Sequence, residues 1–252
     1  MSATARVLAS GRPAIRRAPG PAPVARELAM IALAATAYIG VRAVSEGRTD
    51  VAERNARELV RLQEWLGVAW EASAQSLVLG RDWLVALCNW IYIYGHWPVI
   101  ATAALVLFFT RRDRYRLLRN AVFVSGVIGF LFFALVPVAP PRLLDIGLVD
   151  TVAEQSAAYR TLQPPELTNQ YAALPSLHVG WNLLVGIVVF GTTRRLVLRA
   201  FAVVTPAAMA FAVVATANHY VLDVVVGVAV VLVGLAAALR LQRRATVGSD
   251  GS

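Results

Sequence analysis

The hydrophobic residues of this chain are gathered in six long runs, separated by short polar or arginine-rich segments. Most of the runs come close to the roughly 20 residues that a helix needs to cross the hydrocarbon core of a bilayer. The pattern predicts six transmembrane helices, near residues 27–44, 83–110, 119–138, 178–193, 197–216 and 219–239. The expected fold class is therefore all-α, a polytopic membrane protein.

Two stretches differ from a plain membrane span. The second run, 83–110, contains Gly95 and Pro98, and a kink is expected there because proline removes a helical hydrogen bond. Between the first two runs, residues 50–66 place apolar side chains at helical spacing among charged ones. This segment is expected to be an amphipathic helix, and the pattern fits a position on the membrane surface as well as packing against the bundle.

The composition leaves room for one membrane domain only. Hydrophobic residues make up 58% of the 252 positions, with a mean hydropathy of +0.61, whereas soluble domains carry about 45–50% apolar residues. We expect the domain to span 27–240, between a disordered basic cytoplasmic arm at 1–26 and a short cytoplasmic tail at 241–252. The Arg-rich arm also has features of an organelle transit peptide.

The distribution of arginine predicts the topology. All 24 basic residues are Arg, and with a cytoplasmic N-terminus 16 of them fall on the cytoplasmic side, in segments 1–26, 111–119, 194–199 and 240–244. This bias in short segments follows the positive-inside rule, so both termini are expected in the cytoplasm. The net charge of +9 then reflects membrane topology, and no nucleic-acid partner is expected. Arginine without lysine, with much Ala and Val, is typical of a GC-rich bacterial genome, which favours a bacterial plasma membrane.

The same topology brings distant polar residues to the extracytoplasmic face. Arg142 follows the third segment on that side, in "PVAPPRL". His178 opens the fourth segment and His219 opens the sixth, both from that side. A site built from these residues would face outside.

The stretch "YAALPSLHVGW" predicts a helix start with Ser176 as its cap and His178 in the first turn. The free N–H groups and the dipole of a first turn favour an anion. An ordinary membrane helix with an interfacial histidine fits the stretch equally well.

The stretch "NHYVLD" places Asp223 one turn into an apolar segment, where a carboxylate needs a partner. His219 lies four residues earlier, on the same helix face. A carboxylate that fixes the tautomer of an imidazole is a common catalytic arrangement. A structural polar pair between helices is the alternative.

Two motifs together resemble the type 2 phosphatidic acid phosphatase superfamily. They are P-S-x-H at Pro175–His178 and H-x-x-x-D at His219–Asp223. The resemblance implies a six-helix membrane core, with His219 as a nucleophile that forms a phosphohistidine and Asp223 as its orienting group. It makes His178 the general acid and base and Ser176 a phosphate-binding group, without a metal or other cofactor. The stretches "GHWP", "PVAPPRL" and "NHYVLD" look most like the inositol phosphorylceramide synthase-like branch.

The chain departs from the superfamily pattern at two phosphate-binding elements. A K-x6-R-P motif is missing, and Ala212 and Val213 stand where Ser-Arg is expected. Arg142 is the expected replacement, because a guanidinium binds phosphate in a bidentate way; snorkelling or a salt bridge to Asp145 is the alternative. Further candidates for substrate binding are Tyr171, Asn218 and His96, the last of which also fits a buried structural histidine.

These observations favour a membrane enzyme that acts on a lipid-linked phosphate ester. We expect transfer of a phospho-headgroup to an alcohol acceptor, as in an inositolphosphotransferase. Hydrolysis of a lipid phosphate by water is the first alternative. A lipid transporter without covalent chemistry is a more remote one, and so is a zinc site built from His96, His178, His219 and Asp223.

Overall fold

The computed structural model describes residues 21–152 and 169–249, and in this part of the chain the regular secondary structure is helical, apart from one isolated bridge between Val138 and Ala172. In chain order the helices are α2 (Pro21–Ser45), α3 (Thr49–Leu66), α4 (Glu71–Ser76), α5 (Asp82–Tyr94), α6 (Trp97–Thr110), α7 (Arg112–Leu135), the 3-10 turn η1 (Pro141–Leu143), α10 (Leu177–Thr192), α11 (Leu196–Ala215) and α12 (Val221–Ser249).

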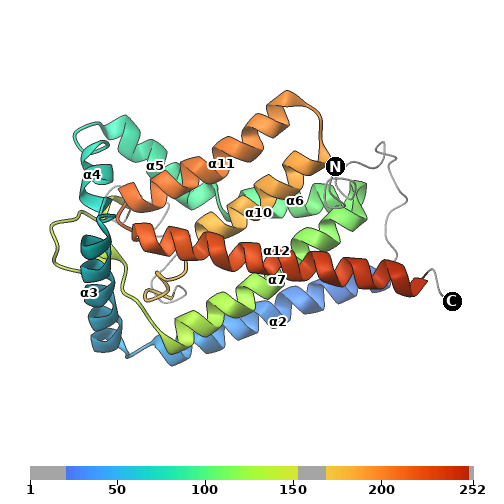
Figure 1. The fold of residues 1–252 in the computed structure, drawn as a ribbon, viewed down its shortest axis with the longest axis horizontal. Helices are drawn as coiled ribbons and strands as arrows, with labels where there is room; N and C mark the ends of the chain where they lie inside the picture. The colour runs from blue at the N-terminus through green and yellow to red at the C-terminus, as the bar shows by residue number, and fades with distance from the viewer. Residues whose placement is uncertain (1–20, 153–168, 250–252) are drawn as a thin grey trace.

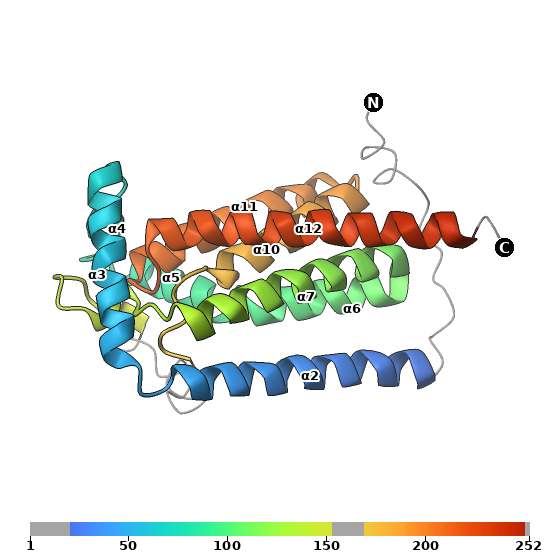
Figure 2. The same cartoon turned by 60° about the horizontal axis from the view of Figure 1, so that its bottom comes forward.

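The long helices form a bundle around α10, which packs against α6, α7, α11 and α12 (Figure 1). Helix α2 runs along α7 at the edge of the bundle. Helices α3 and α4 stand across one end of it, as Figure 2 shows. The first turn of α2 and the last turn of α12 are both at the opposite end. This arrangement gives the bundle one end crossed by α3 and α4 and another where α2 begins and α12 ends.

All six predicted segments are helical, but they differ in their ability to span a membrane. Four helices are long and apolar enough, namely α2 from Val24, α7, α11 and α12 up to Arg244. Helices α5 and α6 qualify only as a pair, bent by 45° at the break around Gly95. Helix α10 is apolar but has only 16 residues. This pattern supports a membrane protein with several spans, and the number of six spans stays a prediction.

Several predicted boundaries were wrong. The segment 111–119, expected to be a loop, forms the first turns of α7 from Arg112 onward. Arg and Leu are good helix formers, and this segment packs through buried Leu117 and Leu118, while Arg119 pairs with Glu27 of α2.

The helices also extend into both predicted flanking segments. Helix α2 already begins at Pro21, where proline suits a first turn, and α12 continues to Ser249. The rest of the predicted arm, 1–20, lies outside the described residues.

Helix α3 has the amphipathic character that its sequence predicts. It buries Ala52, Ala56 and Gln63, while Trp65 is 81% exposed and Leu62 is exposed beside it. One face therefore packs against the bundle, and the other leaves apolar side chains uncovered, as in a helix at a membrane interface.

Two glycines allow α10 to lie directly against α12. A Cβ atom on Gly227 would overlap the carbonyl oxygen of Ser176, and a Cβ atom on Gly180 would overlap the side chain of Val231. Any larger residue would push the helices apart. This close approach carries the first turn of α10, with His178, to the first turn of α12.

Candidate active site

A tight loop between α11 and α12 presents His219. The carbonyl oxygen of Val213 accepts hydrogen bonds from the main-chain N–H groups of both Asn218 and His219, each at 3.0 Å. Ala217 adopts the left-handed conformation with φ of 56°. The Asn218 side chain donates to Thr216 within the same loop, at 2.9 Å to Oγ1. These contacts hold His219 in a defined position, with only 4% of its surface exposed.

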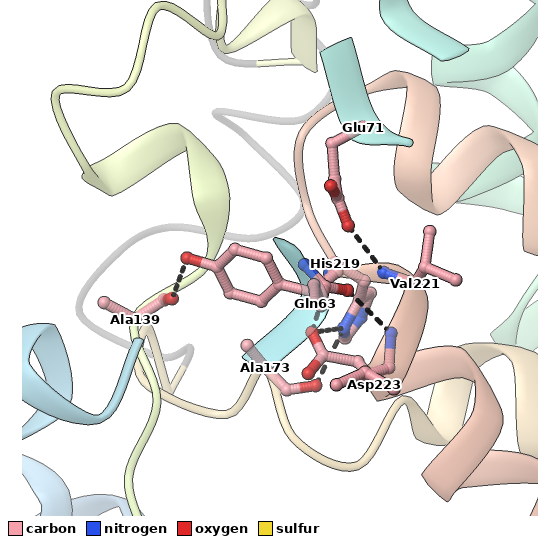
Figure 3. A network of polar contacts seen from close by, with 9 residues as sticks. Gln63, Glu71, Ala139, Ala173, His219, Val221 and Asp223 are labelled. Carbon is pink, nitrogen blue, oxygen red and sulfur yellow. Dashed lines mark hydrogen bonds and ion pairs between the residues drawn. The ribbon is translucent and has the colours of Figure 1, made fainter. Parts of the chain in front are cut away.

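The Nδ1 atom of His219 has two acceptors within reach (Figure 3). The carbonyl oxygen of Ala173 lies 2.8 Å away, and Oδ2 of Asp223 lies 3.4 Å away. Because a carbonyl oxygen can only accept, Nδ1 must carry the proton. The other ring nitrogen, Nε2, then holds the free lone pair. The expected His–Asp pair is present, but the nearer acceptor is a main-chain group that the sequence could not reveal.

Asp223 is fully buried and serves several groups at once. Its Oδ2 atom accepts a hydrogen bond from the N–H of Tyr220 at 2.8 Å, and its main-chain oxygen accepts from the N–H of Ser176 at 2.9 Å. Its Oδ1 atom has no hydrogen-bond partner among the described residues. Asp223 therefore links the two histidine motifs through backbone as well as side chain.

Two side chains from the end of the bundle cap α12, and sequence reasoning missed both. Oε1 of Glu71 accepts a hydrogen bond from the N–H of Val221 at 2.8 Å, and Oε1 of Gln63 accepts from the N–H of Leu222 at 2.9 Å (Figure 3). Both side chains are buried. The only signal in the sequence is Gln63, a polar residue on the packing side of the amphipathic segment; Glu71 lies outside that segment. With these N–H groups occupied, the first turn of α12 has less capacity to bind an anion.

Tyr220 anchors the same loop to the segment before η1. Its hydroxyl group donates to the carbonyl oxygen of Ala139 at 3.1 Å. Burial raises the pKa of the Tyr220 phenol, and the nearby carboxylates of Asp223 and Glu71 raise it further. The phenol therefore remains protonated and keeps its role as a donor.

His178 lies in the first turn of α10, next to His219, with ring centroids 5.6 Å apart. Ser176 precedes the helix as its N-cap residue, and its Oγ atom is buried without a hydrogen-bond partner among the described residues. The first-turn N–H groups of a helix have no partner within the helix. At the start of α12, Glu71 and Gln63 occupy main-chain N–H groups. At the start of α10, by contrast, the hydroxyl group of Ser176 has no partner among the described residues.

Arg142 lies close to the His219 loop, in η1. Its N–H donates to the carbonyl oxygen of Ala217 at 3.0 Å, and its Nε atom pairs with Oδ2 of Asp150 at 3.1 Å. The alternative of a salt bridge to Asp145 was wrong, because Asp150 is the carboxylate within reach. The main chain of Arg142 is therefore fixed to the His219 loop at Ala217, which lies two residues before His219.

The remaining candidates have different surroundings. His96 is buried at the break between α5 and α6, with its ring centroid 4.3 Å from that of His178. The Tyr171 hydroxyl group is hydrogen-bonded to Thr49 at the start of α3, at 2.7 Å. The Asn218 amide group donates within its own loop. The structure thus adds His96 to the histidine pair, and commits the polar groups of Tyr171 and Asn218 to scaffold contacts.

Residues 57–237, more than half of the chain, match the family model of the PAP2 superfamily. The chain belongs to the PAP2 superfamily. This superfamily is the one that the two histidine motifs indicate, and membership supports an enzyme of the lipid phosphatase type. The match does not separate the inositol phosphorylceramide synthase-like branch from others, so that part stays a prediction.

The crystal structure of LpxE from Aquifex aeolicus has a similar fold. Its TM-score is 0.52 at 15% sequence identity, and the alignment covers 68% of this chain and 92% of LpxE. No curated protein gives a significant match to this chain. The structural similarity supports the helical fold independently of the sequence motifs.

The departures from the PAP2 pattern at Ala212 and Val213 have a structural basis. Both residues have no exposed surface. Ala212 packs in a cluster with Val85 and Cys88, and Val213 packs with Tyr92 and Val179. An arginine at 213 would place its charge in this apolar cluster, so this position does not suit a cation.

The zinc alternative is not supported by the arrangement of the side chains. In the described part of the chain, no group of three or more His, Cys, Asp and Glu residues is placed so that it could hold a metal ion.

Proposed function

We propose that this PAP2 protein transfers a phospho group from a lipid-linked phosphate ester to a hydroxyl acceptor, with His219 as the nucleophile. The observation that carries the proposal is the hydrogen bond from Nδ1 of His219 to the carbonyl oxygen of Ala173, with Asp223 as second acceptor. It leaves the lone pair of Nε2 free for attack on phosphorus, and a neutral imidazole is a good nucleophile near pH 7.

The first step forms a bond between Nε2 of His219 and phosphorus and breaks the bond to the lipid oxygen. The leaving oxygen needs a proton, which His178 donates in this proposal; its ring lies 5.6 Å from that of His219. The positive charge that develops on His219 is stabilised by Asp223, as in other imidazole–carboxylate pairs. The products are a phosphohistidine and a lipid alcohol.

The second step transfers the phospho group to the acceptor. His178, now neutral, removes the proton from the acceptor hydroxyl group, whose oxygen attacks phosphorus as the P–N bond breaks. His219 and His178 both return to their starting protonation states.

Three groups support the binding of the phosphoryl oxygens. These are the hydroxyl group of Ser176, the free N–H groups at the start of α10 and the guanidinium of Arg142. Helix N-termini bind anions well, and arginine can bind a phosphate with two parallel hydrogen bonds. In this proposal the substrate phosphate competes with Asp150 for Arg142.

We propose an alcohol as the acceptor, which makes the protein a phosphotransferase of the inositolphosphotransferase type. The apolar packing at Ala212 and Val213 and the burial of the His219 imidazole favour an acceptor that brings its own hydroxyl group into a dry site. Hydrolysis by water is the second candidate, and PAP2 membership favours it equally. A non-enzymatic transporter would leave the paired histidines without a role.

We also propose that the site faces the extracytoplasmic side of a bacterial plasma membrane. Helix α12 begins at the end of the bundle crossed by α3 and α4. The arginine-rich start of α7 lies at the other end, which the positive-inside rule assigns to the cytoplasm.

The acceptor can be identified with purified protein and two labelled substrates, phosphatidate and headgroup-labelled phosphatidylinositol, each with and without long-chain alcohols. Label in a new lipid product supports transfer, whereas release of free phosphate or inositol phosphate alone supports hydrolysis. Acid-labile, base-stable labelling of the protein identifies the phosphohistidine. A His219→Ala protein that folds and still turns over substrate would overturn the nucleophile assignment.

A further inference from the structure

The His178 imidazole is held in an unusual way for an acid–base histidine. Such histidines are commonly oriented by a hydrogen bond from one ring nitrogen to a carboxylate or carbonyl group. Among the described residues, the His178 ring makes no hydrogen bond; only its main-chain oxygen does, as the acceptor for Asn182 at 2.9 Å. Aromatic rings pack against it instead.

Two rings contact His178 directly. Tyr92 of α5 stacks on it with ring centroids 4.8 Å apart and planes inclined by 25°. His96, at the break between α5 and α6, lies with its centroid 4.3 Å away at 38°. Such ring pairs stabilise a defined geometry without using a hydrogen-bonding atom.

His96 is itself fixed from behind. It stacks on Trp181 with ring centroids 5.8 Å apart and nearly parallel planes at 8°, and Trp97 meets it edge-on at 5.0 Å. Its Nδ1 atom lies 3.5 Å from the amide nitrogen of Asn182. Trp181 is in turn held by a hydrogen bond from its Nε1 atom to Ser125 at 3.1 Å. The His96 ring therefore has little freedom to turn away from His178.

The bend between α5 and α6 is what brings His96 to this place. The break requires Gly95, because a Cβ atom there would overlap the carbonyl oxygen of Ile91 and lie 3.1 Å from Cε of Met209. In a continuous helix His96 would follow the direction of α5. The kink expected at this point in the sequence thus has a role in building the site.

We propose that Tyr92 and His96 form a ring clamp that positions His178 for proton transfer. This inference rests on the proposed function, in which His178 first donates a proton to the leaving oxygen and then removes one from the acceptor. A carboxylate partner would occupy one ring nitrogen of His178. The clamp holds the ring through aromatic contacts, and both nitrogens stay available to substrate and acceptor. His96 and Tyr92 are positioning residues, not proton carriers.

The test separates the shape of residue 96 from its acid–base chemistry. His96→Ala removes the ring and should lower kcat about tenfold, the order expected for loss of an aromatic pair, with KM unchanged. His96→Phe keeps an aromatic ring of similar size and should recover most of kcat. Tyr92→Phe should resemble the wild type, whereas Tyr92→Leu should lose kcat like His96→Ala.

Controls make each outcome decisive. Trp90→Leu alters an exposed aromatic residue of α5, 64% exposed, and should leave kcat unchanged. A thermal unfolding curve for each purified variant identifies those that fail to fold. If His96→Ala fails to fold, the comparison of Tyr92→Phe with Tyr92→Leu tests the proposal.

If His96→Phe is as inactive as His96→Ala, His96 exchanges protons and the clamp proposal is wrong. If His96→Ala and Tyr92→Leu keep full kcat while His178→Ala is inactive, the clamp fails and the proposed function stands. Activity in His178→Ala would overturn both.

Discussion

The Nδ1 atom of His219 lies 2.8 Å from the carbonyl oxygen of Ala173, closer than the 3.4 Å that separate it from Oδ2 of Asp223. Ala173 lies two residues before the P-S-x-H motif, which begins at Pro175. The segment that carries His178, the proposed general acid, therefore also orients His219, the proposed nucleophile, through its backbone. The Ala173 carbonyl group already keeps the proton on Nδ1 of His219, and the Asp223 carboxylate contributes a negative charge nearby.

Asp223→Asn should consequently reduce activity without abolishing it. The Ala173 carbonyl oxygen keeps Nδ1 protonated, and the amide oxygen can still accept the Tyr220 N–H. We expect a loss in kcat of about 10- to 100-fold, the usual range for a residue that orients a reactive group. Turnover of lipid phosphate by Asp223→Asn, compared with His219→Ala, checks this. Equal inactivity of the two folded variants would mean that Asp223 contributes more than orientation.

Arg142→Ala should weaken substrate binding. Loss of a charge-assisted hydrogen bond costs about 1.5–3 kcal/mol, which corresponds to an increase in KM of roughly 10- to 150-fold. Arg142→Lys should recover only part of it, because an ammonium group cannot form two parallel bonds. The matched control is Asp150→Asn, which releases the guanidinium and should lower KM or leave it unchanged. A KM unaffected by Arg142→Ala would make this residue a structural anchor of η1.

Gly227→Ala should disturb the contact between α10 and α12. The added Cβ atom overlaps the carbonyl oxygen of Ser176, and overpacking of this kind costs about 1–3 kcal/mol. Both the thermal midpoint in detergent and kcat should fall, because the overlap moves His178 away from His219. Gly40→Ala in α2 is the control, since its Cβ atom meets nothing within 4 Å. Similar behaviour of the two variants would contradict the role assigned to Gly227.

Glu71→Ala should loosen the first turn of α12, whereas Glu71→Gln should not. The amide oxygen of glutamine can still accept the N–H of Val221, so the cap survives without the charge. Loss of a helix cap costs about 0.5–2 kcal/mol. Thermal unfolding of both variants measures the difference, with Glu64→Ala on the exposed side of α3 as control. If Glu71→Gln is as unstable as Glu71→Ala, the charge and not the hydrogen bond is responsible.

The orientation in the membrane can be tested with single cysteines in a Cys88→Ser protein. Asp145→Cys lies in the exposed segment after η1, and Arg195→Cys lies in the exposed connection between α10 and α11. A membrane-impermeant thiol reagent added to intact cells should label the first and spare the second. The reverse pattern would place the site on the cytoplasmic side.

Much of the fold follows from local pattern. The apolar runs predicted where the apolar helices lie, because burial in lipid demands a continuous apolar segment. The start of α7 was placed too late, since arginines read as a loop also extend a helix beyond the membrane. The break at Gly95 was visible as a kink, but its direction depends on the contact with Met209.

The candidate site was predictable where chemistry lies in side chains at fixed spacing. His178, His219 and Asp223 could be named from two short motifs, because ionisable groups in apolar segments are rare and costly. Gln63 and Glu71 could not, since their partners Leu222 and Val221 are more than 100 positions away and take part through main-chain N–H groups.

By itself the sequence determined the helical membrane class, the two histidine motifs and the absence of a Ser-Arg pair before His219. The tertiary structure decided how these residues work together: which acceptor holds Nδ1 of His219, which carboxylate pairs with Arg142, and which rings surround His178. The physical reason is that spacing along a helix specifies neighbours on one face only. Contacts between helices depend on close approach at residues such as Gly227, and on backbone groups that every residue shares.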